Sequence, residues 1–265
     1  DGIRAFAIIA VIINHFNKDF LPSGYLGVDI FFVISGYVIT SSLEGRKSLN
    51  FFDFISSFYQ RRLRRLVPAL LFFVLIFSLI SCLFLSDPNF VIRTGISSLF
   101  GLSNLYLIKS STDYFAQSTQ LNLFTHTWSL GVEEQFYFIF PLFIWFSGFG
   151  KQKKKGTGLL LNIMLILGFI SLILFIQIYR FNQPLAYFSM PTRFWEIASG
   201  CIVFLGLKKK MLFANICKRV SPSIVFITII AVMFLPKYFS IISTILVVIL
   251  SSILIICLSP NKKLY

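Results

Sequence analysis

Long apolar runs separated by short polar or basic segments make up most of this chain. Eight of these runs approach the roughly 20 residues that a helix needs to cross a bilayer, and they cover residues 2–17, 25–43, 66–86, 132–149, 158–179, 193–207, 222–236 and 240–258. The pattern predicts an all-α fold, a polytopic transmembrane helix bundle of about eight spans. We expect residues 1–265 to form a single transmembrane domain.

A ninth apolar stretch, residues 90–108, differs from the others because it is rich in polar and small side chains, among them Arg93, Thr94 and Asn104. Such a segment is poorly suited to face lipid and suits a helix that lines a cavity. If it crossed the membrane fully, the basic clusters at 61–65 and 151–155 would fall on opposite sides, against the tendency of Lys and Arg to stay in the cytosol. We therefore predict a re-entrant or interfacial segment, and cytosolic positions for both ends of the chain.

The composition supports a membrane protein and excludes a soluble single-domain protein. Hydrophobic residues make up 57% of the chain and charged residues 13%, against roughly 45–50% and about 25% in soluble domains. The formal charge of +14 would indicate nucleic-acid binding in a soluble protein. Here the basic residues cluster between apolar runs, as in loops that lie in the cytosol beside anionic lipid. We expect membrane lipid as a partner and no nucleic acid; the sequence does not identify any protein partners.

The cysteines and the start of the chain bear on metal binding and on processing. The cysteines are isolated and lack the spacing of a metal site, so we predict no metal and interpret them as packing residues: Cys82, Cys201, Cys217 and Cys257. The first apolar run lacks the cleavage site of a signal peptide. Because the chain opens on Asp1 instead of Met, we expect it to be truncated.

Two ionisable residues in the first run, Arg4 and His15, are candidate catalytic residues. They are eleven residues apart, so on a helix they return to one face, about 16 Å apart along the axis. Histidine can accept and return a proton near neutral pH. The alternative is an arginine that snorkels at the helix end and a histidine among lipid headgroups.

The segment THTWSLGVEEQFY carries four more candidates. Glu133 and Glu134 enter an apolar run side by side, about 100° apart on a helix, so at least one should face the interior of the bundle. We interpret them as catalytic, with His126 and Trp128 as substrate-binding residues. Alternatively, Ser129 caps this helix and the glutamates favour the positive end of its dipole without any catalytic role.

An all-arginine cluster precedes the run at 66–86 and consists of Arg61, Arg62, Arg64 and Arg65. Guanidinium groups bind phosphates through two parallel hydrogen bonds, whereas the other basic clusters are mostly lysine. We therefore predict a phosphate-binding site for a cofactor, with Pro68 in the first turn of the following helix. The alternative is ordinary anchoring of a cytosolic loop.

Three further ionisable residues lie inside apolar runs: Asp29, Arg193 and Glu196. Arg193 and Glu196 are three residues apart and could pair on one helix face, which is the purely structural interpretation. Because charged groups are costly within a bilayer, we also consider all three as substrate-binding residues.

These residues occur within a series of motifs that resembles acyltransferase family 3, a family of integral membrane O-acyltransferases. The motifs, in chain order, are DGIRAFAIIAVIINHF, GYLGVDIFFVISGYVIT, FYQRRLRRLVPA, THTWSLGVEEQFYFIFPL and RFWEIASG. The family pattern of an Arg or Lys, ten residues and a His falls on Arg4 and His15, and its RxxR pattern falls on Arg62 and Arg65. The wording of the motifs is similar to the branch that acetylates lipopolysaccharide O-antigen or related glycans.

The resemblance implies a protein of the bacterial cytoplasmic (inner) membrane that uses acetyl-CoA as acyl donor and a glycan or lipid-linked glycan as acceptor. It implies that Arg4 and His15 are essential and that the arginines handle the donor. Family members usually have about ten spans, sometimes followed by an extracytoplasmic hydrolase-like domain of the SGNH type. Since eight spans are predicted here, we expect the final spans and any such domain to be absent from this chain.

The resulting hypothesis is that the arginines hold the phosphates of acetyl-CoA at the cytosolic side while His15 acts within the bundle. His15 would deprotonate a sugar hydroxyl or carry the acyl group itself, and the sequence does not separate these routes. Glu133, Glu134 or Asp29 could orient its imidazole. Arg4 could bind the pantetheine or phosphate portion, or offset charge on the thioester oxygen.

Two other classes of protein remain as alternatives. A transporter or flippase for an acylated or phosphorylated lipid would also need intramembrane charges and an interrupted helix, although no inverted repeat is visible. A membrane scaffold or sensor would use the charges only for pairing. Neither the acceptor sugar nor the identity of the acyl chain can be derived from the residues.

Overall fold

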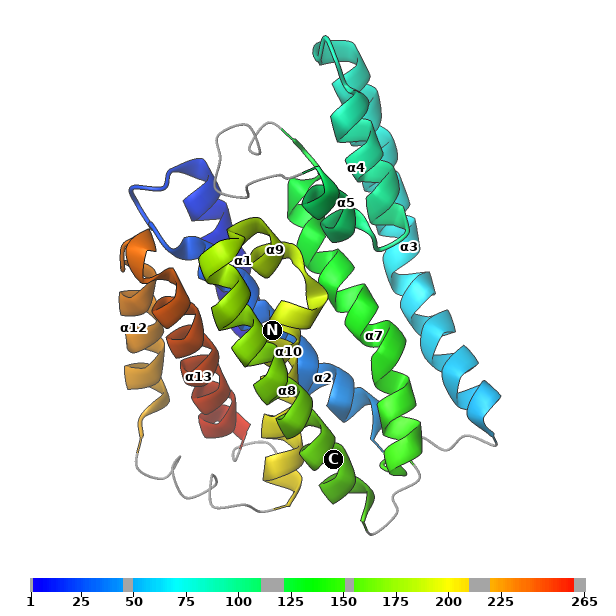
Figure 1. The fold of residues 1–265 in the computed structure, drawn as a ribbon, viewed down its shortest axis with the longest axis vertical. Helices are drawn as coiled ribbons and strands as arrows, with labels where there is room; N and C mark the ends of the chain where they lie inside the picture. Colours follow the sequence, from blue (N-terminus) through cyan, green and yellow to red (C-terminus); the bar gives the residue numbers. More distant parts are fainter. Residues whose placement is uncertain (1, 45–49, 111–121, 151–154, 210–219, 260–265) are drawn as a thin grey trace. The chain divides into compact units, whose positions relative to one another are not determined.

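The structure, a computed structural model, describes residues 2–44, 50–110, 122–150, 155–209 and 220–259. Residues 151–154 of the basic cluster at 151–155 lie outside the described residues, as do the basic residues at 46–47 and 210–219 and Cys217. Every regular element in the described ranges is a helix (Figure 1). The predicted all-α class is confirmed.

Each of the eight predicted runs coincides with a helix, and these helices are α1 (Gly2–Phe16), α2 (Gly27–Leu43), α3 (Phe51–Phe84), α7 (Trp128–Ser147), α8 (Gly156–Phe181), α10 (Met190–Lys208), α12 (Pro222–Met233) and α13 (Ser240–Leu258). Among the described residues, four helical segments are long and apolar enough to cross a membrane: Gly24–Leu43, Phe51–Phe84, Gly156–Phe181 and Ser240–Leu258. Shorter apolar helices are Gly2–Phe16 and Pro222–Met233. These helices indicate a membrane protein; the count of eight spans stays a prediction.

The ninth stretch, 90–108, forms two short helices, α4 (Asn89–Leu99) and α5 (Ser103–Lys109). At 1.5 Å per residue they measure about 16 and 10 Å, too short to cross a hydrocarbon core of about 30 Å. The chain turns between them at Gly101, whose φ of 67° lies in the left-handed region that favours glycine. This interruption agrees with the prediction that 90–108 is not a simple span, while its depth in the membrane stays a prediction.

Helix α3 begins much earlier than predicted. The side chain of Asn50 accepts a hydrogen bond from the backbone N–H of Asp53 and caps the helix, which therefore starts at Phe51. The predicted first-turn position of Pro68 is wrong, because Pro68 lies in the middle of this 34-residue helix. Its missing N–H leaves the carbonyl of Arg64 without the usual helical donor. The arginine cluster is thus part of a continuous helix.

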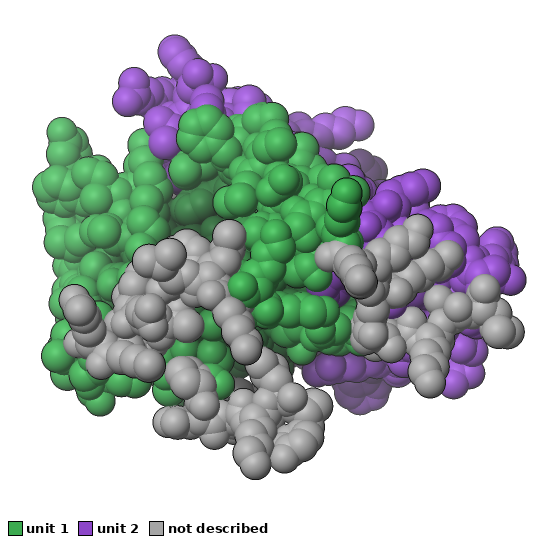
Figure 2. Space-filling view, turned by 90° about the horizontal axis from the view of Figure 1, so that it is seen from below, with its two compact units in different colours: residues 1–44, 152–172, 194–265 green, residues 45–151, 173–193 purple. Residues whose placement is uncertain are grey.

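The described residues fall into two compact units (Figure 2). Unit 1 comprises 1–44, 152–172 and 194–265, and unit 2 comprises 45–151 and 173–193. Unit 1 therefore holds α1, α2, α12 and α13, and unit 2 holds α3, α4, α5, α7 and the short helix α9 (Gln183–Phe188). Helices α8 and α10 each contribute residues to both units.

In unit 1, glycines allow helix backbones to touch. A Cβ added to Gly36 of α2 would collide with the carbonyl oxygen of Ile197, and one added to Gly200 of α10 would collide with that of Val33. The two helices run in the same direction, because the ion pair between Glu44 and Lys208 joins their C-terminal ends. Such small residues are typical of helix crossings in membranes.

This crossing makes the first prediction. Gly200→Ala should destabilise the protein by about 1–3 kcal/mol, because the new methyl group has only backbone to displace. Gly168→Ala in α8 is the matched control, since its Cβ would lie at an ordinary 3.4 Å from the Cβ of Ala198. The control should be neutral or stabilising by up to about 1 kcal/mol. Thermal unfolding in detergent checks both variants, and equal midpoints would refute the tight crossing.

Unit 2 is organised around α3 and α7. Phe54 and Phe58 on the first turns of α3 are buried, and the ring of Phe54 contacts that of Trp145 near the end of α7, with centroids 5.7 Å apart. Further along α3, Val74 forms a buried cluster with Val91 and Phe124. The arginine cluster lies between these two packed regions.

Candidate functional site

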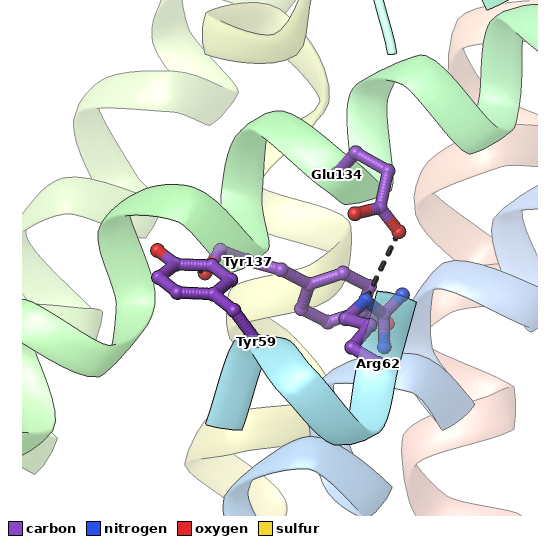
Figure 3. A network of polar contacts seen from close by, with 4 residues as sticks. All are labelled: Tyr59, Arg62, Glu134 and Tyr137. Atoms are coloured by element: carbon purple, nitrogen blue, oxygen red, sulfur yellow. Dashed lines mark hydrogen bonds and ion pairs between the residues drawn. The ribbon is translucent and has the colours of Figure 1, made fainter. Parts of the chain in front are cut away.

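The best-defined polar arrangement in unit 2 is centred on Arg62 (Figure 3). Its Nε donates a hydrogen bond to Oε1 of Glu134 on α7 over 3.0 Å, within an ion pair. The guanidinium carbon lies 3.4 Å from the centre of the Tyr137 ring. A charge-assisted hydrogen bond and a cation–π contact therefore fix the same side chain from two directions.

Tyr59, one turn before Arg62, fastens α3 to α7 (Figure 3). Pro141 lies inside α7 and has no N–H, so the carbonyl of Tyr137 loses its usual helical partner. The Tyr59 hydroxyl donates to the carbonyl of Phe138 over 2.9 Å and lies 3.5 Å from that of Tyr137. The two helices are thus joined beside the arginine site.

Removal of this hydroxyl is expected to loosen the junction. Tyr59→Phe should lower the free energy of unfolding by about 1 kcal/mol, the typical net value of one hydrogen bond. Tyr238→Phe is the control, because Tyr238 is 90% exposed. Thermal unfolding in detergent measures both. An unchanged midpoint for Tyr59→Phe would show that the hydroxyl contributes nothing to the junction.

The four predicted arginines are not equivalent. At about 100° per residue, Arg61, Arg62 and Arg65 share an arc of about 100° with the buried Phe54 and Phe58 of the same helix.

Arg64 points about 160° away from Arg62 on the same helix. Arg61, Arg64 and Arg65 are exposed, whereas the Arg62 side chain is 24% exposed. Arg61, Arg62 and Arg65 thus share a helix face that excludes Arg64, and the phosphate site at this cluster stays a prediction.

The two predicted glutamates have different surroundings. Glu133 is buried, with 7% of its surface exposed, which confirms that at least one of the pair faces inward. Glu134 makes the ion pair with Arg62.

The predicted cap at Ser129 is wrong, because α7 begins at Trp128 and Ser129 lies inside the helix, where its hydroxyl donates to the carbonyl of His126. The first turn of α7 holds no acidic residue. Glu133 and Glu134 lie in its second turn, where the effect of the helix dipole is weaker, and their non-catalytic interpretation stays a prediction.

Arg4 and His15 lie on α1 in unit 1, His15 in its last turn. His15 is exposed and Arg4 is partly buried. Beside His15, the buried Asn14 donates from Nδ2 to the carbonyls of Leu21 over 2.7 Å and Pro22 over 3.1 Å. These bonds hold the turn that follows α1, and with it the helix end that carries His15. Pairing of His15 with Glu133 or Glu134 stays a prediction.

Asp29 on α2 is buried to 2% exposure. Gly27 faces α1, because an added Cβ would meet the carbonyl of Ala7. Asp29 is two residues on, about 200° around the helix, and it shares a face with Gly36, the residue at the α10 crossing. Asp29 thus lies on the side of α2 away from the Gly27 contact with α1, and its predicted role in orienting the His15 imidazole stays a prediction.

Trp128 and Arg193, both predicted as substrate-binding, lie close together in unit 2. Arg193 is 1% exposed, its Nε donates to the carbonyl of Tyr187, and its guanidinium carbon lies 4.4, 5.2 and 5.8 Å from the ring centres of Tyr187, Phe175 and Trp128. Tyr187 and Phe175 were not predicted as neighbours of Arg193, because they lie outside the motifs recognised in the sequence. A buried cation is thus enclosed by aromatic rings.

The remaining predicted residues are spread out. Glu196 is fully buried on α10, and its pairing with Arg193 stays a prediction. His126 is exposed on the short helix η2 (Thr125–Thr127), and its ring meets that of Phe73 edge-on, with centroids 5.4 Å apart. Within the described ranges, no three His, Cys, Asp or Glu side chains gather as a metal site would require.

Comparisons with known proteins agree on one class. A family model described as an acyltransferase domain matches residues 1–265. O-acetyltransferase OatA of Staphylococcus aureus (strain NCTC 8325 / PS 47) is 37% identical over 229 residues, which cover 84% of this chain and 37% of OatA. OatA of strain COL gives the same values. The chain thus spans little more than a third of the length of these relatives. No solved structure matches it.

Proposed function

This chain belongs to the family defined by the acyltransferase domain, and on that premise we propose that it is a membrane O-acetyltransferase. It takes acetyl groups from acetyl-CoA at the cytosolic face of the bacterial inner membrane. The acceptor is a hydroxyl group of an extracytoplasmic or lipid-linked glycan such as O-antigen. Both relatives are named O-acetyltransferase, which supports acetyl as the transferred group. The supporting observation in the structure is the fixed guanidinium of Arg62.

Arg62 suits a donor with phosphate groups. Its bond to Glu134 uses Nε, which leaves the two Nη groups to bind an anion in the forked geometry that phosphates accept. Arg65 follows on the same helix face and is exposed. The pair therefore presents two cations to the diphosphate of coenzyme A, and Glu134 and Tyr137 hold one of them in place before the donor arrives.

His15 performs the proton transfer in this proposal. As a general base it takes the proton of the sugar hydroxyl, the oxygen attacks the thioester carbon, the C–S bond breaks, and the departing thiolate receives a proton. In the second route the imidazole attacks the thioester first, and the acyl group then passes to the sugar oxygen. Both routes give one acetyl ester and one free coenzyme A thiol for each turnover.

Arg4 is better placed to bind the pantetheine or phosphate portion of acetyl-CoA than its thioester. It lies eleven residues before His15 on α1, about 16 Å along the axis, which is too far for both side chains to reach one carbonyl group. We assign Arg4 to the pantetheine or phosphate portion.

The predicted acceptor-binding residues differ in burial: four are buried and one is exposed. Trp128, Arg193 and Glu196 are each at most 1% exposed and Asp29 is 2% exposed, so none of them presents an open surface to an acceptor. His126 is exposed and is the one assigned to acceptor contact.

The experiment that tests the function uses acetyl-CoA labelled separately in the acetyl group and in the coenzyme, added to membranes that contain the protein. We expect the acetyl label to enter glycan as a base-labile ester while the coenzyme label stays in solution as free thiol. Movement of both labels together across the membrane would indicate a transporter. Absence of the ester in membranes that contain the folded protein and its acceptor would contradict the proposal.

A further inference from the structure

The turn between α4 and α5 lies directly against α7, behind the arginine site. A Cβ added to Gly101 would lie 3.2 Å from the Cβ of Glu134. A Cβ added to Gly131 of α7 would lie 2.7 Å from Oδ1 of Asn104 and 3.2 Å from the carbonyl oxygen of Gly101. Both glycines are therefore needed for the turn to approach α7 this closely.

A reciprocal pair of amides holds the turn in place. Nδ2 of Asn104 donates to Oε1 of Gln135 over 3.3 Å and to the carbonyl of Phe188 over 3.0 Å. Nε2 of Gln135 donates to Oδ1 of Asn104 over 2.8 Å and to the carbonyl of Gly101 over 3.2 Å.

Each amide nitrogen carries two hydrogens, so both groups use their full donor capacity in these contacts. Asn104 is completely buried. A satisfied amide network in a buried setting specifies one arrangement of its elements.

Glu134 lies next to Gln135 on α7 and reaches from there to Arg62 (Figure 3). The amide pair fixes the turn, the turn packs against the stem of Glu134, and the carboxylate of Glu134 holds the guanidinium. We propose that Asn104 and Gln135 are positioning residues that act through Glu134 on Arg62, so that the α4–α5 turn sets the affinity for the acyl donor. This inference rests on the proposed donor-binding role of Arg62.

The expected signature is a change in donor KM and little change in kcat, since the amides lie behind the phosphate site and not at the reacting atoms. Asn104→Ala should raise KM for acetyl-CoA about tenfold, with kcat within about threefold. Gly101→Ala is a second variant that keeps both amides: its methyl group would lie 3.2 Å from the Cβ of Glu134, and the left-handed φ of 67° adds backbone strain at the same turn.

Asn122→Ala is the matched control. Asn122 is another buried asparagine of unit 2, 5% exposed, whose amide bonds go to Thr94 and to the backbone of Phe124, away from Glu134. It should lose stability, as any buried asparagine would, without raising the donor KM. An increase equal to that of Asn104→Ala would reduce the effect to general loosening and overturn the proposal.

A double-mutant cycle gives the decisive comparison. If the amides act through Glu134, Asn104→Ala should change KM by less than about twofold in a Glu134→Ala background. A full tenfold effect in that background would overturn the proposal. Arg62→Ala, measured in the same assay, separates the proposed donor site from this inference. An unchanged donor KM for Arg62→Ala overturns both. A raised donor KM for Arg62→Ala, with an unchanged one for Asn104→Ala and Gly101→Ala, overturns the inference alone.

Discussion

Replacement of His15 by alanine is expected to lower acetyl transfer by about 10²–10⁴-fold, the usual contribution of a general base. The loss should appear in kcat, because the proposed mechanism places His15 at the reacting atoms and the donor phosphates at the arginines. Release of free coenzyme A thiol from acetyl-CoA in membranes with saturating acceptor measures it. The same loss is expected on the route in which His15 carries the acyl group.

The His15→Ala protein should still fold. His15 is exposed, and the neighbouring Asn14, which stays in the variant, holds the turn after α1 through its bonds to the carbonyls of Leu21 and Pro22. Normal abundance and an unchanged unfolding temperature in detergent therefore serve as the control. His126→Ala, the other histidine variant that the chain offers, should change the KM for the acceptor and retain kcat within about tenfold. A His15→Ala protein with full kcat would remove His15 from the mechanism.

Arg62→Ala is expected to raise the KM for acetyl-CoA by about 10–100-fold. Hydrogen bonds to charged groups contribute about 1.5–3 kcal/mol each, and every 1.4 kcal/mol is a factor of ten in affinity. The substitution also releases Glu134, whose unpaired carboxylate would then repel the donor phosphates. Initial rates over a range of acetyl-CoA concentrations give the value.

Arg64→Ala is the matched comparison because Arg64 has the same charge and lies two residues on, on the opposite side of α3. Its donor KM should stay within about threefold of the wild type. Equal increases for the two variants would mean that the cluster acts only through its summed charge, and the assignment of the donor site to the Arg62 face would then be wrong.

The helices were predictable because apolar runs of bilayer length leave the backbone few other choices. The start of α3 was not predicted, since its first turns are amphipathic and carry the arginines. A local signal was nevertheless present, because Asn50 followed by Asp53 is a capping pattern that needs no burial to act. The interruption at 90–108 was visible in its polar residues, whereas the turn at Gly101 depends on packing against α7.

The site was predictable in its parts and not in its pairings. The sequence marked Arg62 and Glu134 separately, but they are 72 residues apart, and no periodicity joins positions on different helices. Pro141 was a readable sign that the carbonyl of Tyr137 lacks its helical donor, yet only the fold shows that the Tyr59 hydroxyl lies 3.5 Å from this carbonyl and donates to that of Phe138. The difference between Arg62 and Arg64 follows from the helical period once α3 is known to be continuous through the cluster.

The most direct test of the account uses sealed inside-out membrane vesicles, whose cytosolic face is turned outward. Acetyl-CoA labelled in the acetyl group is added outside, and ester-bound label on glycan inside the vesicles is measured for the wild type and for His15→Ala at equal abundance. The account predicts labelled glycan inside wild-type vesicles and a loss of at least about a hundredfold in His15→Ala vesicles. Equal label in both, or no glycan label with the wild type, would contradict it.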